Sequence, residues 1–96
     1  MQTLKDKVIL VTGANRGIGK SLVKESLNKG AKKVYATCRD LSKMPEFEDN
    51  RVVILELDIT NNHEIEQVVK QALDTEVLIN NAGVLSAGSI LNGKIA

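Results

Sequence analysis

The chain has 96 residues, of which 43% are hydrophobic and 26% are charged, a composition typical of a globular domain and not of a disordered chain. Its net charge of +1 and its 2% of aromatic residues disfavour nucleic acid and anionic membranes as partners. No apolar run has the length of a signal peptide or a transmembrane helix, and the one cysteine fits a reducing compartment, so we expect a cytoplasmic protein. The length predicts a single domain, residues 1–96.

Four short apolar runs predict four β-strands, at about residues 7–12, 33–38, 51–57 and 76–80. The runs are nearly continuous instead of alternating, which is typical of parallel strands covered on both faces. Residues 41–50 contain the only proline and predict a connection with at most one helical turn.

Two segments between these strands have helical periodicity. The first follows the first strand and is expected to end at Gly30; its apolar positions are Ile18, Leu22, Val23, Ser26 and Leu27. The second follows the third strand, with Asn61 and Glu64 as a capping box; its apolar positions are Ile65, Val68, Val69, Ala72 and Leu73. Residues 84–96 predict a loop at a truncated end of the fold. The order predicts the first half of a doubly wound α/β fold.

The turn after the first strand, from Thr12 to Gly19, reads T-G-A-N-R-G-I-G. Free backbone N–H groups and the positive end of the helix dipole favour phosphate at such a turn. Glycines there let a bulky anion approach the backbone. The strand–turn–helix context therefore predicts a nucleotide-binding turn, with a tight turn that binds nothing as the alternative.

A P-loop is a second interpretation of the same residues. Ala14–Ser21 resembles a Walker A loop with alanine in place of its first glycine, so that Lys20 would meet phosphates and Ser21 would hold Mg²⁺. Asp58, directly after the third apolar run, imitates a Walker B strand. A P-loop has no reason, however, to carry the N-N-A-G sequence that follows the fourth strand.

Three motifs in order resemble the short-chain dehydrogenase/reductase family. They are T-G-x-x-x-G-x-G at Thr12 to Gly19, D-I-T at Asp58 to Thr60 and N-N-A-G at Asn80 to Gly83. The resemblance implies a partial Rossmann-like parallel sheet with strand order 3-2-1-4, and an oxidoreductase that transfers hydride between a nicotinamide cofactor and a carbonyl or alcohol.

The resemblance also implies a cofactor site. Glycines of the turn would hold the pyrophosphate beside the backbone of Ile18, and Asp58 would accept from the adenine amino group beside Ile59. Asn81 and its two followers would line the adenosine ribose, whereas Asn80 is expected to tie the sheet together. Asp58 as a helix cap remains an alternative. The full set is Gly13, Asn15, Arg16, Gly17, Ile18, Gly19, Arg39, Asp58, Ile59, Asn81, Ala82 and Gly83. No metal site is expected, and His63 is interpreted as a surface residue.

The end of the second strand favours NADP over NAD. Family members that prefer NAD carry an acid where this chain has Cys38, and the next residue is Arg39. Arg16 in the glycine turn is a second base, so two guanidinium groups could meet one phosphate. Asp40 leaves NAD open as the less favoured cofactor, because a shift of one residue would bring its carboxylate into range.

The family's catalytic Tyr-x-x-x-Lys pair does not occur, so no catalytic residue is expected in this chain. A carbonyl or alcohol substrate is therefore expected only in a full-length parent. A non-enzymatic remnant that binds dinucleotide is a further alternative. Because Val77, Leu78 and Ile79 would lie at an uncovered sheet edge, we also expect self-association through the fourth strand.

Overall fold

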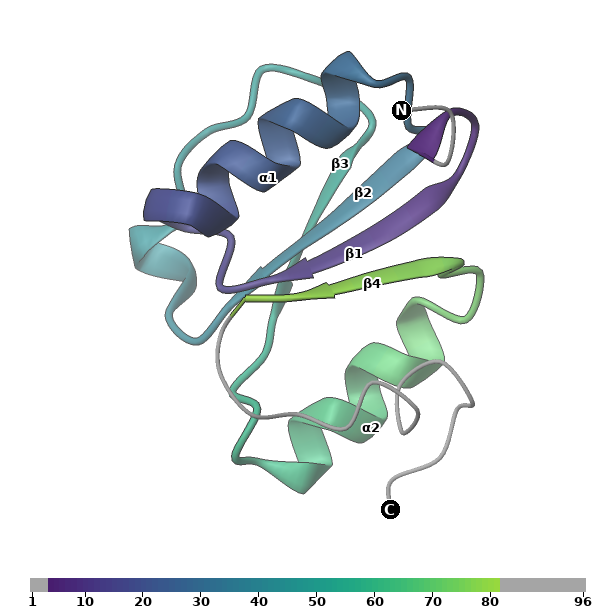
Figure 1. Ribbon diagram of the computed structural model, residues 1–96. Helices are drawn as coiled ribbons and strands as arrows, with labels where there is room; N and C mark the ends of the chain where they lie inside the picture. Colours follow the sequence, from purple (N-terminus) through teal and green to yellow (C-terminus); the bar gives the residue numbers. More distant parts are fainter. Residues whose placement is uncertain (1–3, 82–96) are drawn as a thin grey trace.

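A computed structural model describes residues 4–81 of the chain (Figure 1). Its elements are β1 (Val8–Thr12), α1 (Gly17–Asn28), β2 (Lys33–Cys38), the 3₁₀ turn η2 (Leu41–Lys43), β3 (Val52–Glu56), α2 (Asn62–Gln71) and β4 (Val77–Asn80). Within the described range, no helix has the length and apolar character needed to span a membrane.

The four strands form one parallel sheet in the order β3-β2-β1-β4, which confirms the predicted order and fold class. β1 lies in the interior of this sheet, with Leu10 between Tyr35 of β2 and Leu78 of β4. The chain moves outward from β1 to β3 and then crosses back to the other side of β1. This reversal separates the loops that leave β1 and β4, and ligands of open α/β sheets bind in the resulting crevice.

Two hydrophobic cores lie on the two faces of the sheet, because side chains of β1 alternate between them. Val8 and Leu10 pack with the buried side of α2, including Ile65 and Val68. Ile9 and Val11 pack in the core that contains Val23 of α1. Figure 1 shows α1 and α2 on opposite faces of the sheet.

Two residues that were predicted on the apolar helix faces are instead exposed. Ile18 is 71% exposed because it lies in the first turn of α1, beyond the edge of the core. Leu73 is 75% exposed because α2 ends at Gln71, two residues before it. The periodicity of the sequence therefore extends past the packed part of each helix.

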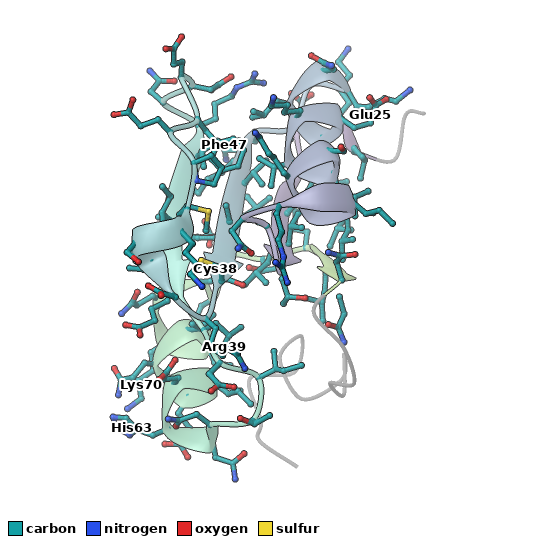
Figure 2. All side chains as sticks on the ribbon, turned by 90° about the vertical axis from the view of Figure 1, so that its left-hand side faces the viewer. Glu25, Cys38, Arg39, Phe47, His63 and Lys70 are labelled. Atoms are coloured by element: carbon teal, nitrogen blue, oxygen red, sulfur yellow. The ribbon has the colours of Figure 1, made fainter. Side chains whose placement is uncertain are left out.

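The connection from β2 to β3 contains only the short turn η2. Side chains of this connection pack against α1 and bond to the residues at its C-terminal end. Met44 and Phe47 pack against the α1 core, and Phe47 lies on the α1 side of the molecule in Figure 2. The Arg51 guanidinium donates to the carbonyl oxygens of Leu27 and Ala31, at 3.3 and 3.1 Å. Arg51 thus joins the connection to the C-terminal end of α1, where the Leu27 carbonyl also accepts from the backbone N–H of Gly30.

The same guanidinium pairs with Asp49, and this pair predicts an acid-dependent contribution to stability. Arg51 Nη2 and Nε donate to the Asp49 carboxylate at 2.6 and 2.9 Å, which lowers the pKa of Asp49 from 3.8 to about 2. Since the folded-state pKa is the lower one, the contribution is complete above about pH 4 and is lost as the pH falls through about 2. We expect Asp49→Asn to lower the melting temperature at pH 7 and to have a smaller effect at pH 2.

Circular-dichroism melting of both proteins across this pH range measures the difference. The exposed neighbour Glu48 provides a matched control, and Glu48→Gln is expected to leave the melting temperature nearly unchanged at both pH values. Equal effects of Asp49→Asn at pH 7 and pH 2 would contradict the assignment.

The described sheet ends in β3 on one side and in β4 on the other. All four residues of β4 are partly exposed, as are Val53 and Ile54 of β3. Self-association through β4 stays a prediction.

Candidate dinucleotide-binding site

A cavity of about 870 Å³ lies at the carboxyl ends of the strands, where the sheet order reverses. Of the residues predicted to bind cofactor, the cavity is lined by Gly13, Asn15, Arg16, Gly17, Ile18, Arg39, Asp58, Ile59 and Asn81. It is also lined by five residues outside that predicted set: Cys38, Asp40, Lys43, Leu57 and Thr60. Gly19 is buried and does not line the cavity, and Ala82 and Gly83 lie outside the described residues.

The glycines of the turn adopt backbone conformations, or lie so close to other atoms, that a side chain would cause strain or a clash. Gly13 and Gly17 have φ angles of 63° and 57°, in the left-handed region that favours glycine. A Cβ atom on Gly19 would overlap the carbonyl oxygen of Gly13 and lie 2.7 Å from Asn81 Nδ2. The close approach of α1 to the turn therefore depends on the third glycine. The turn leads into the N-terminus of α1, where no side chain caps the helix, so its first N–H groups are available to an anion.

The Thr12 hydroxyl joins the ends of β1 and β4. It donates to Asn80 Oδ1 at 2.9 Å and accepts from the backbone N–H of Asn81 at 2.9 Å. Asn81 Nδ2 in turn donates to the Gly13 carbonyl at 3.3 Å. Asn80 therefore ties the two strands together, and Asn81 connects β4 to the glycine turn.

We expect Thr12→Val to destabilise the fold by about 1–3 kcal/mol, because valine keeps the volume but removes both hydrogen bonds of a buried hydroxyl. Thr12→Ser is the matched control, since it keeps the hydroxyl and removes one buried methyl group, worth about 1 kcal/mol. Urea unfolding measures both free energies. A valine variant as stable as the unmodified chain would contradict the assigned role.

Asp58 occupies the loop after β3 and keeps an ionised carboxylate. Its Oδ1 accepts from the Thr60 hydroxyl at 2.6 Å and from the Thr60 backbone N–H at 2.9 Å. These bonds, together with the charge of Arg39, lower the pKa of Asp58. The side-chain cap of α2 is Asn61, which accepts from the N–H of Glu64, so the cap interpretation of Asp58 is wrong. Asp58 is held as an acceptor in the cavity wall, beside Ile59 and Leu57.

Three cationic side chains line the cavity: Arg16 from the glycine turn, Arg39 after β2, and Lys43 at the end of η2. Figure 2 shows Arg39 below Cys38, toward α2. Lys43 was not predicted from the sequence. The spacing of Asp40 and Ser42 is typical of an Asx turn, and this turn begins the short helix η2 that brings Lys43 to the cavity.

The carboxylate of Asp40 is engaged by that cap. Asp40 Oδ1 accepts from the Ser42 hydroxyl at 2.7 Å and from the Ser42 backbone N–H at 3.0 Å, and these bonds lower the pKa of Asp40. Burial raises the pKa of the Cys38 thiol, so the residue at the end of β2 carries no charge at neutral pH. Oδ1 of the Asp40 carboxylate therefore holds η2, and Asp40 lines the cavity next to Arg39.

Metal ligation has no support in the described range, where no three His, Cys, Asp or Glu side chains gather in a way that could hold an ion. His63 is exposed, on the outer side of α2 in Figure 2.

The fold is that of a Rossmann-like dinucleotide-binding domain. It combines a parallel sheet of this order, a glycine turn where the order reverses, and the acceptor Asp58 beside the apolar side chains of Leu57 and Ile59. The family model described as short chain dehydrogenase matches residues 7–95. The chain belongs to the short-chain dehydrogenase family, whose members bind a nicotinamide dinucleotide. This membership decides against the Walker A interpretation.

Several curated proteins are similar to the chain over less than half of their own length. Human retinol dehydrogenase 11 is 40% identical, with 85% of this chain and 29% of that protein covered. The 3-oxoacyl-[acyl-carrier-protein] reductase of Buchnera aphidicola is 35% identical, with 98% of this chain and 41% of that protein covered.

Solved structures have the same fold. A short chain dehydrogenase from Burkholderia cenocepacia, in complex with NADP, has a TM-score of 0.80 and 42% identity, with 88% of this chain and 35% of that chain covered. The NADPH-bound carbonyl reductase from chicken fatty liver has a TM-score of 0.75 and 32% identity, with 88% and 37% covered.

Proposed function

We propose that the chain is the NADP-binding portion of a short-chain dehydrogenase/reductase whose whole protein transfers hydride between NADP(H) and a carbonyl or alcohol substrate. The nicotinamide ring supplies the hydride chemistry when the cofactor is bound. The residues of this chain bind and orient the dinucleotide.

The observation that carries the preference for NADP is the division of charge at the end of β2. Arg16, Arg39 and Lys43 line the cavity, whereas the carboxylate of Asp40 is bound to Ser42. A 2′-phosphate would meet these cations. At the end of β2, where NAD-binding sites carry a carboxylate for the ribose 2′-hydroxyl, this chain has Cys38. The NADP and NADPH complexes of two similar structures support the same preference.

The remaining predicted residues have proposed roles along the dinucleotide. The glycine turn and the N-terminus of α1 bind the pyrophosphate through backbone N–H groups. Asp58 accepts a hydrogen bond from the adenine amino group, and Asn81 lines the adenosine ribose. The volume of about 870 Å³ accommodates a ligand of this size.

Titration of the chain with NADPH and NADH, followed by nicotinamide fluorescence and by calorimetry, tests the proposal. We expect saturable binding with NADPH favoured over NADH by about tenfold or more, as a charge-assisted contact would give. Equal affinities would remove the proposed preference, and no binding of either would overturn the function for this chain.

We expect no turnover by this chain alone, because its sequence lacks the Tyr-x-x-x-Lys pair that would supply a proton. The rate of NADPH oxidation in the presence of small carbonyl compounds measures this turnover. Both a portion of an enzyme and a non-enzymatic remnant would bind NADPH without turnover, so this result is expected for either.

A further inference from the structure

The cap of α2 and the loop that holds Asp58 form one hydrogen-bonded unit. The sequence predicts a capping box in which Glu64 reaches back to the N–H of Asn61. That N–H already donates to the carbonyl of Asp58 at 2.9 Å. Glu64 Oε1 instead accepts from the backbone N–H of Asp58 at 2.9 Å.

Two further hydrogen bonds, both with Asn61, hold Glu64 in this position. Its own N–H donates to Asn61 Oδ1 at 3.1 Å, and its Oε2 accepts from Asn61 Nδ2 at 3.3 Å. It lies half-buried directly before Ile65, which packs in the core beneath α2. A carboxylate near the N-terminus of a helix is also stabilised by the helix dipole.

From this arrangement we infer that Glu64 is a positioning residue for the cofactor site, which fixes the backbone of Asp58 so that its carboxylate faces the adenine amino group. The side chain of Asp58 is oriented from one side by Thr60 and its backbone from the other by Glu64. Without Glu64, the backbone N–H of Asp58 loses its partner and the loop between β3 and α2 gains freedom. The inference rests on the proposed function, because it needs Asp58 to read the adenine.

The test compares NADPH with its deamino analogue, in which hypoxanthine replaces adenine and a carbonyl oxygen stands where the amino group was. A correctly placed Asp58 carboxylate accepts from the amino group and repels the carbonyl. We expect the 96-residue chain to prefer NADPH by about tenfold or more, the range of a hydrogen bond to a charged group. The ratio of the two dissociation constants therefore reports where the carboxylate lies, and a uniform loss of stability does not change it.

Glu64→Ala is expected to reduce this preference about threefold or more, whereas Glu64→Gln, which keeps the Oε1 acceptor, is expected to restore it. Glu64→Asp keeps the charge but is too short to reach the Asp58 N–H, so it serves if the alanine variant does not fold. Glu66→Ala, on an exposed position of the same helix, is the matched control and should leave the preference unchanged.

Asp58→Asn separates the proposed function from the inference about Glu64. If this variant keeps the preference for adenine, or if the unmodified chain binds no NADPH, the proposed role of Asp58 fails and the inference fails with it. If Asp58→Asn loses the preference but folded Glu64→Ala or Glu64→Asp retains it in full, only the positioning role of Glu64 is overturned.

Discussion

Gly19→Ala is expected to disrupt the site more strongly than Gly17→Ala in the same turn. Its Cβ atom would overlap the Gly13 carbonyl oxygen and crowd Asn81 Nδ2, both of which hold the glycine turn against β4. Backbone atoms cannot rotate away as a side chain would, so α1 must move away from the turn. We expect a loss of about 3 kcal/mol of folding stability, the upper part of the usual range for overpacking.

The same displacement should weaken NADPH binding about 100-fold, because the N-terminus of α1 and the turn would no longer converge on the pyrophosphate. Urea unfolding and fluorescence titration measure the two effects. Titration at temperatures where the variant remains folded separates lost affinity from lost structure.

Two other glycines provide matched controls for this result. Gly17 has a φ of 57° and no atom within 4 Å of the position that a Cβ would take, so Gly17→Ala adds conformational strain of about 1–2 kcal/mol without a clash. Gly30 has a φ of 86° and only Lys5 nearby, at the opposite end of α1 from the cavity. Gly30→Ala should lower stability and leave affinity for NADPH unchanged. If Gly19→Ala binds NADPH as well as Gly30→Ala does, the close approach at Gly19 has no role in the site.

The sequence predicts the sheet and most of the cavity wall because both depend on short local patterns. Apolar runs mark the strands, and the glycine turn follows β1 directly, so Gly13 and Gly17 reach the cavity wherever the sheet has the predicted order. Strand order came from a family resemblance, since periodicity alone does not say which strands are neighbours.

Residues in the connection from β2 to β3 were harder to place, because tertiary contacts determine its path. Lys43 reaches the cavity through the cap between Asp40 and Ser42, and Arg51 reaches the end of α1 across 24 residues of sequence. The Glu64 carboxylate was predicted to accept from the backbone N–H of Asn61, but that N–H donates to the Asp58 carbonyl, and the carboxylate accepts from the Asp58 N–H instead. The capping pattern of Asn61 and Glu64 was recognisable in the sequence, but the partner of the Glu64 carboxylate was not.

Arg39→Asp is expected to shift the cofactor preference from NADPH toward NADH. The substitution removes a cation from the cavity wall and adds a carboxylate two residues before Leu41, where η2 begins. A 2′-phosphate then loses a charge-assisted contact and meets like charge, whereas a ribose 2′-hydroxyl gains an acceptor. We expect NADPH to bind about 30-fold more weakly, within the range for a hydrogen bond to a charged group.

Adding Arg16→Ala should increase the shift, because Arg16 lines the same cavity from the glycine turn. Lys24→Asp is the matched control: it makes the same change of net charge on an exposed position of α1 that does not line this cavity, and it should leave the ratio of NADPH to NADH affinities unchanged. Competitive titration with both dinucleotides is carried out at two salt concentrations. Salt screens the long-range electrostatic effect of net charge more strongly than it screens a direct contact, so a ratio of affinities that persists at high salt indicates a direct contact. An unchanged ratio in Arg39→Asp and in the double variant would mean that the 2′-position of the ribose is read by other residues.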